Sequence, residues 1–302
     1  MENTAFQTKI RDFLPGIALR FAEPMKKHTS FRIGGPAEVM AFPSNREELS
    51  QILKVSKLLD TQCRILGAGT NILAPDEGIK GIVICLKDCL DGMTLLPGDR
   101  VQIAAGVSMA RAAMFAASHA LSGLEFAHGI PGTVGGGVYM NAGAYGGEIC
   151  QVCESVEVMG ADGTVRTYAG SEMAFSYRHS RLEDEGGIVL CATFALTPKP
   201  ETEIREKMQE LMAKRRASQP LDKPSAGSAF KRPVGGYAAA LIDGAGLKGY
   251  RVGDAAISEK HAGFAVNLGE ATAADVQELL RQVSDKVYDN SGIRIEPEVR
   301  LW

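Results

Sequence analysis

Residues 129–147 read Gly129-Ile-Pro-Gly-Thr-Val-Gly-Gly-Gly-Val-Tyr-Met-Asn-Ala-Gly-Ala-Tyr-Gly-Gly147, a run dense in glycine and free of charged side chains. Glycine inside a helix or strand costs about 0.5–1 kcal/mol relative to alanine, so this run is not expected to form either. We expect a backbone that approaches a bound ligand closely and offers N–H groups where a Cβ would collide. Thr133 and Asn141 would be its side-chain hydrogen-bonding groups. The alternative is a set of bulges and tight turns in a packed core.

A second glycine-containing stretch, Gly67-Ala-Gly-Thr-Asn71, follows the expected strand Cys63–Leu66. It begins like a dinucleotide-binding turn, but that fingerprint needs a third glycine and then a helix. Ile72 takes the glycine position and Pro75 interrupts the helix, so we reject the Rossmann interpretation. The loop is predicted to cradle a pyrophosphate with its N–H groups, between two strands.

The chain has 302 residues, a formal net charge of -3 and a sequence pI near 6.0. That length allows two or three domains with a large buried core. The weak charge gives no global basic field, so nucleic acid is not an expected partner. The N-terminus has no apolar signal region, and no apolar run is long enough to span a membrane. We therefore expect a cytoplasmic protein without a membrane partner.

Most cysteines lie in apolar runs and are expected to be reduced thiols, as in a long chain without a signal peptide. The Cys150-Gln-Val-Cys153 spacing is also typical of zinc or redox sites, and Cys85 with Cys89 offers a second pair. The alternation after Cys153 favours a strand over zinc. The dispersed histidines form no ligand pattern either, so no metal is predicted.

Several stretches carry signals for regular structure. Ser44-Asn-Arg-Glu47 is a capping box that predicts the start of a helix, and Ala161-Asp-Gly163 predicts a tight turn between two alternating strands. Pro198 and Pro200 mark a boundary. Other expected elements are helices at 108–121, 201–217, 238–242 and 272–289, strands at 81–86, 101–105, 188–196 and 263–267, and an extended end at 293–302.

Seven separated stretches, in order, resemble the UDP-N-acetylenolpyruvoylglucosamine reductases of bacterial peptidoglycan synthesis. Each stretch alone is a weak signal, but the ordered set covers nearly the whole chain and is specific. The stretches are Thr29-Ser-Phe-Arg-Ile-Gly-Gly35, Leu66-Gly-Ala-Gly-Thr-Asn71, Gly129-Ile-Pro-Gly-Thr-Val-Gly-Gly136 with Asn141-Ala-Gly143, Ser176-Tyr-Arg178, Gly227-Ser-Ala-Phe-Lys231, Ser258-Glu-Lys-His261 and Glu296-Pro-Glu-Val-Arg300.

The resemblance implies an α+β flavoenzyme. Its two-part FAD-binding region would be of the vanillyl-alcohol-oxidase, PCMH-like type, with parts at 1–88 and 89–199, and a smaller α+β substrate-binding domain would occupy 200–302. NADPH would reduce the FAD, and the reduced flavin would pass hydride to the enolpyruvyl ether of UDP-N-acetylglucosamine, giving UDP-N-acetylmuramate. One class of the family has an extra Tyr-bearing loop before the last domain. Here Thr197 is followed almost at once by the helix at Glu201, so the chain resembles the shorter class.

Three residues match the family's catalytic positions. Hydride addition pushes negative charge onto the substrate carboxylate, and the permanently charged fork of Arg178 suits that carboxylate. Glu298 matches a glutamate to which the family assigns the same stabilising role. As a neutral acid it would donate a hydrogen bond to the growing charge, and its ionisation state depends on its burial. Ser228 matches the general acid that protonates the adjoining carbon, a task that a hydroxyl can perform only toward a strongly basic acceptor such as a carbanion.

The resemblance also points to binding residues. Predicted cofactor contacts are Gly67, Ala68, Gly69, Thr70, Asn71, Gly132, Thr133, Gly135, Gly136, Asn141 and Gly143. Predicted substrate contacts are Tyr177, Arg216, Lys231 and Lys260, because a dianionic diphosphate requires compensating cations. Each of these cations could equally be solvated surface charge, and Arg216 also suits the C-terminus of a helix.

Two other functions fit parts of the sequence. A flavoenzyme of the same fold could oxidise another small sugar or hydroxy acid, although the blocks around Ser228 and Glu298 argue against it. A non-catalytic nucleotide-binding module would use the glycine loops and leave Arg178 as a bystander. Flavin colour, and NADPH oxidation that depends on the enolpyruvyl sugar nucleotide, separate the three functions. The sequence indicates no oligomeric state.

Overall fold

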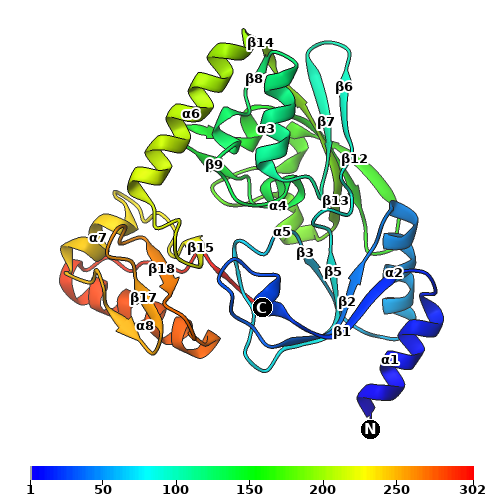
Figure 1. The fold of residues 1–302 in the computed structure, drawn as a ribbon, viewed down its shortest axis with the longest axis horizontal. Helices are drawn as coiled ribbons and strands as arrows, with labels where there is room; N and C mark the ends of the chain where they lie inside the picture. The colour runs from blue at the N-terminus through cyan, green and yellow to red at the C-terminus, as the bar shows by residue number, and fades with distance from the viewer. Residues whose placement is uncertain (1) are drawn as a thin grey trace. The chain divides into compact units, whose positions relative to one another are not determined.

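The computed structural model describes residues 2–302, which form two compact units (Figure 1). Two short N-terminal segments belong to the same unit as the C-terminal part of the chain. Unit 1 contains the chain up to Phe21, Val39–Ala68 and Gly81–Lys214, and unit 2 contains Ala22–Glu38, Gly69–Lys80 and Arg215–Trp302. The three-domain division at 1–88, 89–199 and 200–302 stays a prediction.

A four-stranded sheet with the order β1-β2-β5-β3 organises the N-terminal part of the chain. Its strands are β1 (Ala18–Pro24), β2 (Pro36–Phe42), β5 (Ile79–Cys85) and β3 (Cys63–Leu66). The division between the units passes through the first three of these strands. β3 and β5 run parallel, with Cys63 opposite Ile82. In unit 1, α1 (Glu2–Phe13) and α2 (Arg46–Leu58) contribute Ile10, Leu49 and Ile52 to the core that contains β5.

The start of α2 corrects the predicted capping box by one residue. Asn45, not Ser44, is the N-cap, and its Oδ1 accepts the Glu48 N–H at 2.8 Å. Glu48 Oε2 accepts the Ser44 N–H at 2.6 Å. Two adjacent residues here are both good caps, and local sequence alone does not choose between them. The observed choice buries the side chain of Leu49, which follows Glu48 in the helix.

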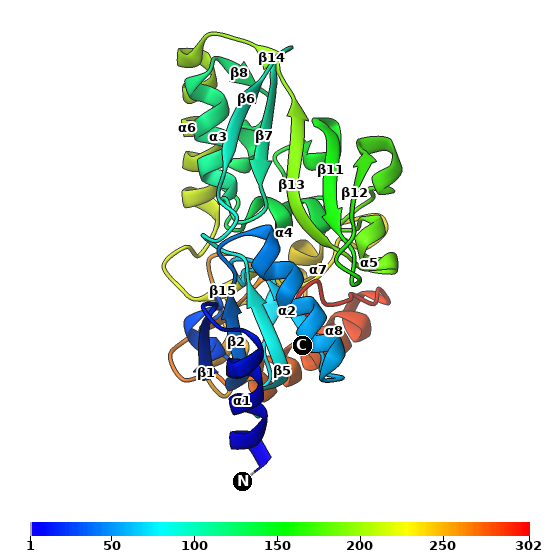
Figure 2. The same cartoon turned by 90° about the vertical axis from the view of Figure 1, so that its right-hand side faces the viewer.

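The rest of unit 1 is built on an antiparallel sheet with the order β12-β11-β13-β7-β6 (Figure 2). Its strands are β6 (Met93–Leu96), β7 (Arg100–Ala104), β11 (Cys153–Met159), β12 (Val165–Ala169) and β13 (Ile188–Ala195). The predicted tight turn joins β11 to β12, where the Gly163 N–H donates to the Gly160 carbonyl at 2.9 Å. The central strand β13 is buried along almost its whole length, as predicted.

Helices pack against this sheet in a common core. Ala112 and Ala116 of α3 (Met109–Ser118) and Ile204 and Met208 of α6 (Glu201–Ser218) lie in one apolar cluster with β13. Between β13 and α6 there is only the short strand β14 (Thr197–Pro198), so the Tyr-bearing loop has no place there. The short elements of unit 1 are β8 (Leu121–Ser122), α4 (Val134–Tyr139), β9 (Gly143–Ala144), β10 (Gly147–Glu148) and α5 (Arg181–Glu185).

Unit 2 has a four-stranded antiparallel sheet with the order β15-β18-β17-β16. Its strands are β15 (Ser225–Ser228), β18 (Phe264–Asn267), β17 (Ala255–Ile257) and β16 (Arg251–Val252), and its helices are α7 (Ala238–Gly244) and α8 (Ala273–Ser291). Thr272 caps α8, the helix predicted at 272–289: its Oγ1 accepts the Asp275 N–H at 3.0 Å, and Asp275 Oδ2 accepts the Thr272 N–H at 3.0 Å. The mixed content of the two units confirms the α+β class.

Two segments from the N-terminal part of the chain complete unit 2. Phe31 and Leu73 join the apolar cluster that α8 also lines. Asp76 accepts the Ala273 N–H at 2.8 Å, so a residue far away in sequence helps to cap α8. A two-stranded parallel sheet joins β4 (Ile72–Leu73) to β19 (Arg300–Leu301).

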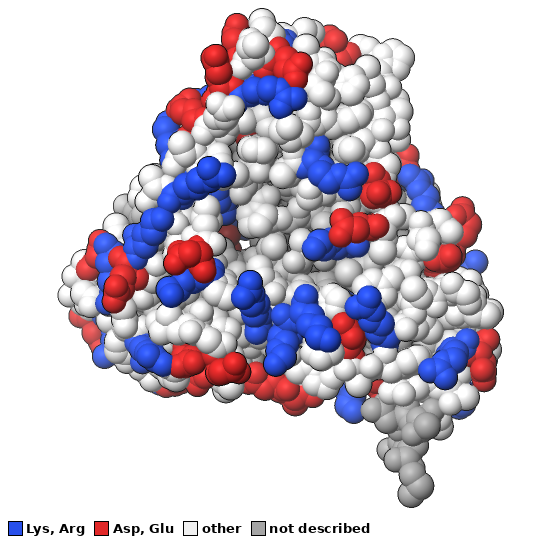
Figure 3. Space-filling model, in the orientation of Figure 1, with Lys and Arg blue, Asp and Glu red and all other residues white. Residues whose placement is uncertain are grey.

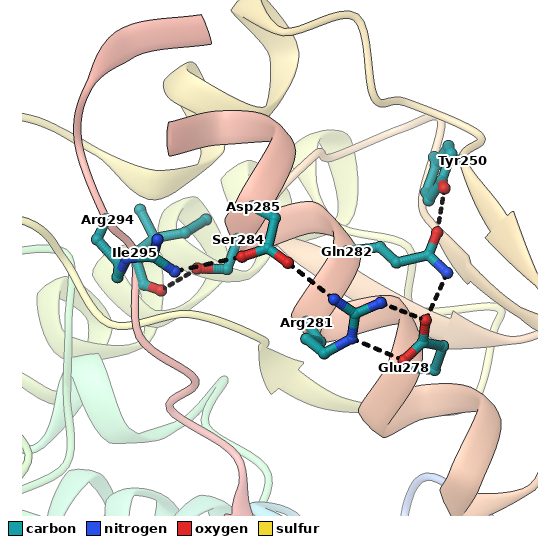
Figure 4. A network of polar contacts seen from close by, with 8 residues as sticks. All are labelled: Tyr250, Glu278, Arg281, Gln282, Ser284, Asp285, Arg294 and Ile295. Atoms are coloured by element: carbon teal, nitrogen blue, oxygen red, sulfur yellow. Dashed lines mark hydrogen bonds and ion pairs between the residues drawn. The ribbon is translucent and has the colours of Figure 1, made fainter. Parts of the chain in front are cut away.

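α8 also holds the C-terminal segment (Figure 4). Ser284 Oγ donates to the Ile295 carbonyl at 2.8 Å, and both residues are buried. Arg281 pairs with Glu278 at 2.6 Å and with Asp285 at 2.9 Å on the exposed side of the helix. The exposed pair of Arg294 with Asp285, at 3.3 Å, also joins the C-terminal segment to α8. Exposed pairs contribute at most about 1 kcal/mol, so the buried Ser284 bond is the firmer link to the segment that carries Glu298.

Acidic and basic side chains are interspersed on the face of the molecule shown in Figure 3. No helix within residues 2–302 is both long and apolar enough to cross a bilayer. In the same residues, no cluster of three or more His, Cys, Asp or Glu side chains is arranged to hold a metal ion. Cys153 opens the strand β11, as its alternating neighbours predicted, whereas Cys150 is exposed.

Candidate functional site

The glycine-rich stretch 129–147 is partly helical, which corrects the expectation that it contains no regular element. Residues Val134–Tyr139 form α4, and the N-cap Thr133 accepts the Gly136 N–H on its Oγ1 at 3.3 Å. The N–H groups of Val134 and Gly135 donate to main-chain carbonyls that follow β7, at 2.8 and 2.9 Å. The expectation of free N–H groups is therefore wrong at these positions, because the fold of unit 1 uses them.

Close packing explains two of the helical glycines. A Cβ at Gly135 would lie 2.9 Å from the Ala105 Cβ, and a Cβ at Gly137 would lie 2.7 Å from the Met109 sulfur. Gly136 differs, because it is exposed and its missing Cβ would have only Thr133 Oγ1 nearby, at 3.6 Å. The helix thus presents bare main chain at Gly136, while its neighbours serve the core.

The loop at 67–71 meets Thr133, the residue that caps the start of α4. A Cβ at Gly67 would lie 2.6 Å from Thr133 Oγ1, so the two glycine-containing stretches adjoin within unit 1. This is the juxtaposition that the cofactor hypothesis requires. Thr133 is buried and its hydroxyl fills the space beside Gly67, so the main chain that reaches the surface here is that of the half-buried Gly67 and the exposed Gly136.

The second half of that loop, Gly69–Asn71, belongs to unit 2. Gly69 has φ +62°, and a Cβ there would overlap the His28 carbonyl oxygen. The Gly69 carbonyl accepts the Ser30 N–H at 3.0 Å. The block around Ser30, for which sequence reasoning found no role, therefore supports this loop. Gly69 is needed by the packing of unit 2 itself, whatever else the loop binds.

These features fit an FAD held largely by main chain. The exposed main chain at Gly136 carries no Cβ, so a flat ring system or a sugar can approach it closely. The left-handed Gly69 gives the adjoining loop the sharp backbone bend that anion-binding nests use. Contacts at Ala68, Thr70, Asn71, Gly132, Gly135 and Gly143 stay predictions.

Arg178 lies in a tight turn of unit 1. Ser176 and His179 exchange both main-chain hydrogen bonds, at 3.1 and 3.2 Å, and enclose Tyr177 and Arg178. Arg178 has φ +56°, a left-handed conformation that is uncommon for a residue with a side chain. Its Nη2 donates to the Gly143 carbonyl at 3.4 Å, and its guanidinium lies over the half-exposed Tyr177 ring. The turn therefore presents a cation beside an aromatic ring.

Ser228 and Glu298 are brought together in unit 2, across 70 positions of sequence. The Glu298 N–H donates to the Ala229 carbonyl at 2.8 Å, and the Lys231 N–H donates to the Glu296 carbonyl at 2.8 Å. Ser228 is exposed at the end of β15, whereas Glu298 is buried. The pairing thus places the main chain of Glu298 beside that of Ala229, the residue that follows the exposed Ser228.

The predicted substrate cations are distributed over unit 2. Lys231 pairs with Glu296 at 3.3 Å, and both are exposed. Lys260 Nζ donates to the carbonyl of Arg216 at 2.6 Å, so these two predicted residues adjoin at the end of α6. The Ser258 hydroxyl accepts the Lys260 N–H at 3.2 Å and shapes the turn. Binding roles for Tyr177, Arg216, Lys231 and Lys260 stay predictions.

Sequence reasoning missed two buried serines that support the site. Ser180 Oγ donates to the Tyr139 carbonyl at 2.8 Å and anchors the Arg178 turn to the end of α4. Ser284 anchors the segment before Glu298 to α8. A lone serine carries no local signal for such a bond, because its partner is defined only by the fold. The adjacency of Ser180 to the Ser176-Tyr-Arg178 block was the one available hint.

Two models of known protein families match separate stretches of the chain. A family model described as the C-terminal domain of UDP-N-acetylenolpyruvoylglucosamine reductase matches residues 219–302. A second model, described as an FAD binding domain, matches residues 37–169. The first covers Ser228 and Glu298, and the second covers the two glycine-containing stretches.

Relatives match along almost the whole chain. The UDP-N-acetylenolpyruvoylglucosamine reductase of Agathobacter rectalis is 47% identical over 310 residues, covering 99% of this chain and 98% of the relative. The protein of the same name from Streptococcus pneumoniae is 43% identical over 293 residues, covering 97% of each. The crystal structure of the Thermus caldophilus reductase superposes with a TM-score of 0.78 at 38% identity, covering 95% of this chain and 98% of that one.

Proposed function

The chain belongs to the UDP-N-acetylenolpyruvoylglucosamine reductase family, and from that premise we propose that it catalyses the reaction of that family. It is an oxidoreductase that reduces the enolpyruvyl ether of UDP-N-acetylglucosamine to UDP-N-acetylmuramate, a step of peptidoglycan precursor synthesis. NADPH is the reductant and FAD the cofactor. FAD, when bound, relays hydride between NADPH and the sugar nucleotide.

Main chain of the two glycine-containing stretches would hold the cofactor. Gly136 supports this assignment, because it is exposed, carries no Cβ and adjoins the 67–71 loop through Thr133. A diphosphate there would be met by peptide N–H groups of the 67–71 loop rather than by a basic side chain. This assignment differs from a Rossmann site, where a glycine-rich turn opens directly into a long helix.

Arg178 would hold the substrate carboxylate. Its guanidinium is planar and permanently charged, so it can bind two carboxylate oxygens at once. The hydrogen bond to Gly143 and the tight turn restrict its orientation before substrate arrives. A preorganised cation stabilises the negative charge that develops on the carboxylate during reduction.

Ser228 and Glu298 would complete the reaction. Hydride adds to the terminal carbon of the enol ether, and the electron pair moves to the carbon beside the carboxylate. The Ser228 hydroxyl then gives its proton to that carbon. Glu298 would stabilise the charged intermediate from its buried position beside the same strand. The exposure of Ser228 supports its role, because the substrate must reach the hydroxyl.

The observation that carries this proposal is the main-chain pairing of Ala229 with Glu298. It brings the main chain of Glu298 to the residue that follows Ser228, in the unit that the reductase-specific family model covers, and this supports a joint role for the two residues. An anaerobic titration tests the function: NADPH should bleach the flavin absorbance, and the enolpyruvyl sugar nucleotide should restore it. A protein that stays colourless with added FAD, or a reduced flavin that this substrate leaves reduced, would overturn the proposal.

The partner that this reaction requires is a small UDP-sugar. We propose that the enzyme meets it in the cytoplasm, since NADPH and nucleotide sugars are produced there. Cell fractionation with immunodetection tests the location, and recovery with membranes after a high-salt wash would contradict it.

A further inference from the structure

Asn141 is a buried side chain whose amide is fully engaged inside unit 1. Its Oδ1 accepts the Cys150 N–H at 2.9 Å, and its Nδ2 donates to Glu148 Oε2 at 3.1 Å and to the Ser176 carbonyl at 3.0 Å. The two main-chain partners fix which end of the amide is oxygen, because an N–H needs an acceptor and a carbonyl needs a donor. Both amide hydrogens are therefore committed to the protein.

The carbonyl that Asn141 holds belongs to the turn that carries Arg178. The Ser176 carbonyl also accepts the His179 N–H, so it closes the turn and receives the Asn141 amide at once. After the turn, the buried Ser180 hydroxyl donates to the Tyr139 carbonyl. Tyr139 and Asn141 thus make hydrogen bonds to the turn on both sides of Arg178.

The turn needs such support. Arg178 has φ +56°, a left-handed backbone that is sterically unfavourable for a residue with a Cβ, so the surrounding contacts must hold it there. Its guanidinium also donates to Gly143, two residues beyond Asn141. One short segment therefore contacts the main chain of the turn and the charged end of its arginine.

We infer that Asn141 is a positioning residue for Arg178, not a ligand of the cofactor. Asn141 holds the Ser176 carbonyl, and through it sets where the guanidinium lies for the substrate carboxylate. This inference deepens the proposed function and rests on it, because it takes Arg178 as the carboxylate-binding group. A displacement of about 1 Å at such a group lowers a rate by about 100-fold.

The test separates the two half-reactions in an Asn141→Asp/Glu148→Gln protein. Aspartate has the shape of asparagine and still accepts the Cys150 N–H, but it cannot donate to the Ser176 carbonyl. The glutamine at 148 supplies a donor to the new carboxylate and avoids two facing negative charges. We expect full FAD content and unchanged flavin reduction by NADPH, with reoxidation by the enolpyruvyl sugar nucleotide about 10–100-fold slower. Glu148→Gln alone is the matched control and should reoxidise at the wild-type rate.

A double-mutant cycle with Arg178→Lys gives the second readout. If Asn141 acts through Arg178, the combined protein should reoxidise no more slowly than Arg178→Lys alone. Additive losses would overturn the inference, as would loss of FAD from the Asn141 variant or a wild-type rate of reoxidation. If the wild-type protein itself is not reoxidised by the substrate, the proposed function fails instead.

Ser180→Ala keeps the inference testable if the Asn141 variant does not fold. This change removes the hydrogen bond from Ser180 to the Tyr139 carbonyl, on the other side of the turn, and leaves every Asn141 contact in place. A reoxidation rate lowered about tenfold, with normal FAD content and NADPH reduction, supports the positioning mechanism. A wild-type rate would overturn it.

Discussion

The turn that carries Arg178 and the strand that carries Ser228 are held by different kinds of hydrogen bond. In unit 1, two side chains, Asn141 and Ser180, hold the turn. In unit 2, main-chain bonds place Ser228 and Glu298: the Ala229 N–H donates to Gly263, and the Ala229 carbonyl accepts the Glu298 N–H. Truncating a side chain removes the first kind of support, whereas the second kind survives any such truncation.

The two regions also differ in which residue adopts the left-handed backbone. In unit 2 it is Gly227, with φ +79°, immediately before Ser228. In unit 1 it is Arg178 itself, with φ +56°. Glycine adopts this conformation without steric cost, while arginine does not. In unit 1 the strained left-handed backbone therefore lies at the functional residue Arg178 itself. In unit 2 the left-handed backbone lies at the glycine before the functional residue Ser228, where it costs little.

The largest expected effect is that of Ser228→Ala. The strand is held by main chain and the hydroxyl is exposed, so the variant should fold normally and lose only the proton donor. We expect reoxidation by substrate to fall by about 10²–10⁴-fold, with flavin reduction by NADPH nearly intact. Stopped-flow absorbance of both half-reactions measures this. An equal loss in the two half-reactions would count against the proton-donor role.

Arg178→Ala and Arg178→Gly test the strain in unit 1. Both should slow reoxidation by about 10²–10³-fold, because both remove the cation. Glycine relieves the left-handed strain and alanine does not, so we expect Arg178→Gly to be more stable than Arg178→Ala by about 1 kcal/mol. Urea unfolding at matched FAD content measures the difference. Equal stabilities would show that the turn is not strained at this residue.

Gly227→Ala tests the corresponding position in unit 2. A Cβ at Gly227 would have no heavy atom within 4 Å, so only the backbone conformation opposes the change. We expect unfolding to become easier by about 1 kcal/mol. Reoxidation should also slow, because Ser228 is the next residue. A stability equal to wild type would remove the proposed contrast between the two regions.

The smallest effect concerns the thiols beside the Asn141 contacts. Burial raises the pKa of Cys153 to about 12, so at pH 8 only about one molecule in 10⁴ carries its thiolate, and iodoacetamide should not label it in the folded protein. Cys150 is exposed and should react first, although burial and Glu148 raise its pKa as well. Glu148→Gln should lower that pKa and speed the labelling of Cys150. Peptide mapping by mass spectrometry measures both sites, and labelling of Cys153 before Cys150 would contradict the structure.

Local sequence predicted the elements whose signals are short-range. The helix that begins near Thr272, the turn at Ala161-Asp-Gly163 and the helix that begins at Glu201 all appear in the structure. The same kind of reasoning misplaced the cap of α2 by one residue, since Ser44 and Asn45 are both good caps. It also missed α4, because the cost of helical glycines is repaid by close packing against Ala105 and Met109.

Some features of the site could be predicted from the sequence, and others are defined only by the tertiary structure. The types of its residues and their order along the chain indicated the family, the cofactor and the reaction, and the relatives confirm these three. The partners of the residues came only from the fold. Asp76 caps a helix 197 positions away, and Asn141 holds a turn 35 positions away.

The sequence alone therefore determined the chemistry, because side-chain types and their spacing define which charges, hydroxyls and bare main chain are available. The tertiary structure decided which of them work together. The sequence predicted Asn141 as a ligand of the cofactor, yet in the structure its buried amide makes three hydrogen bonds to other residues of unit 1. A buried amide must satisfy its hydrogen bonds with whatever groups the fold brings near, and those groups are distant in sequence.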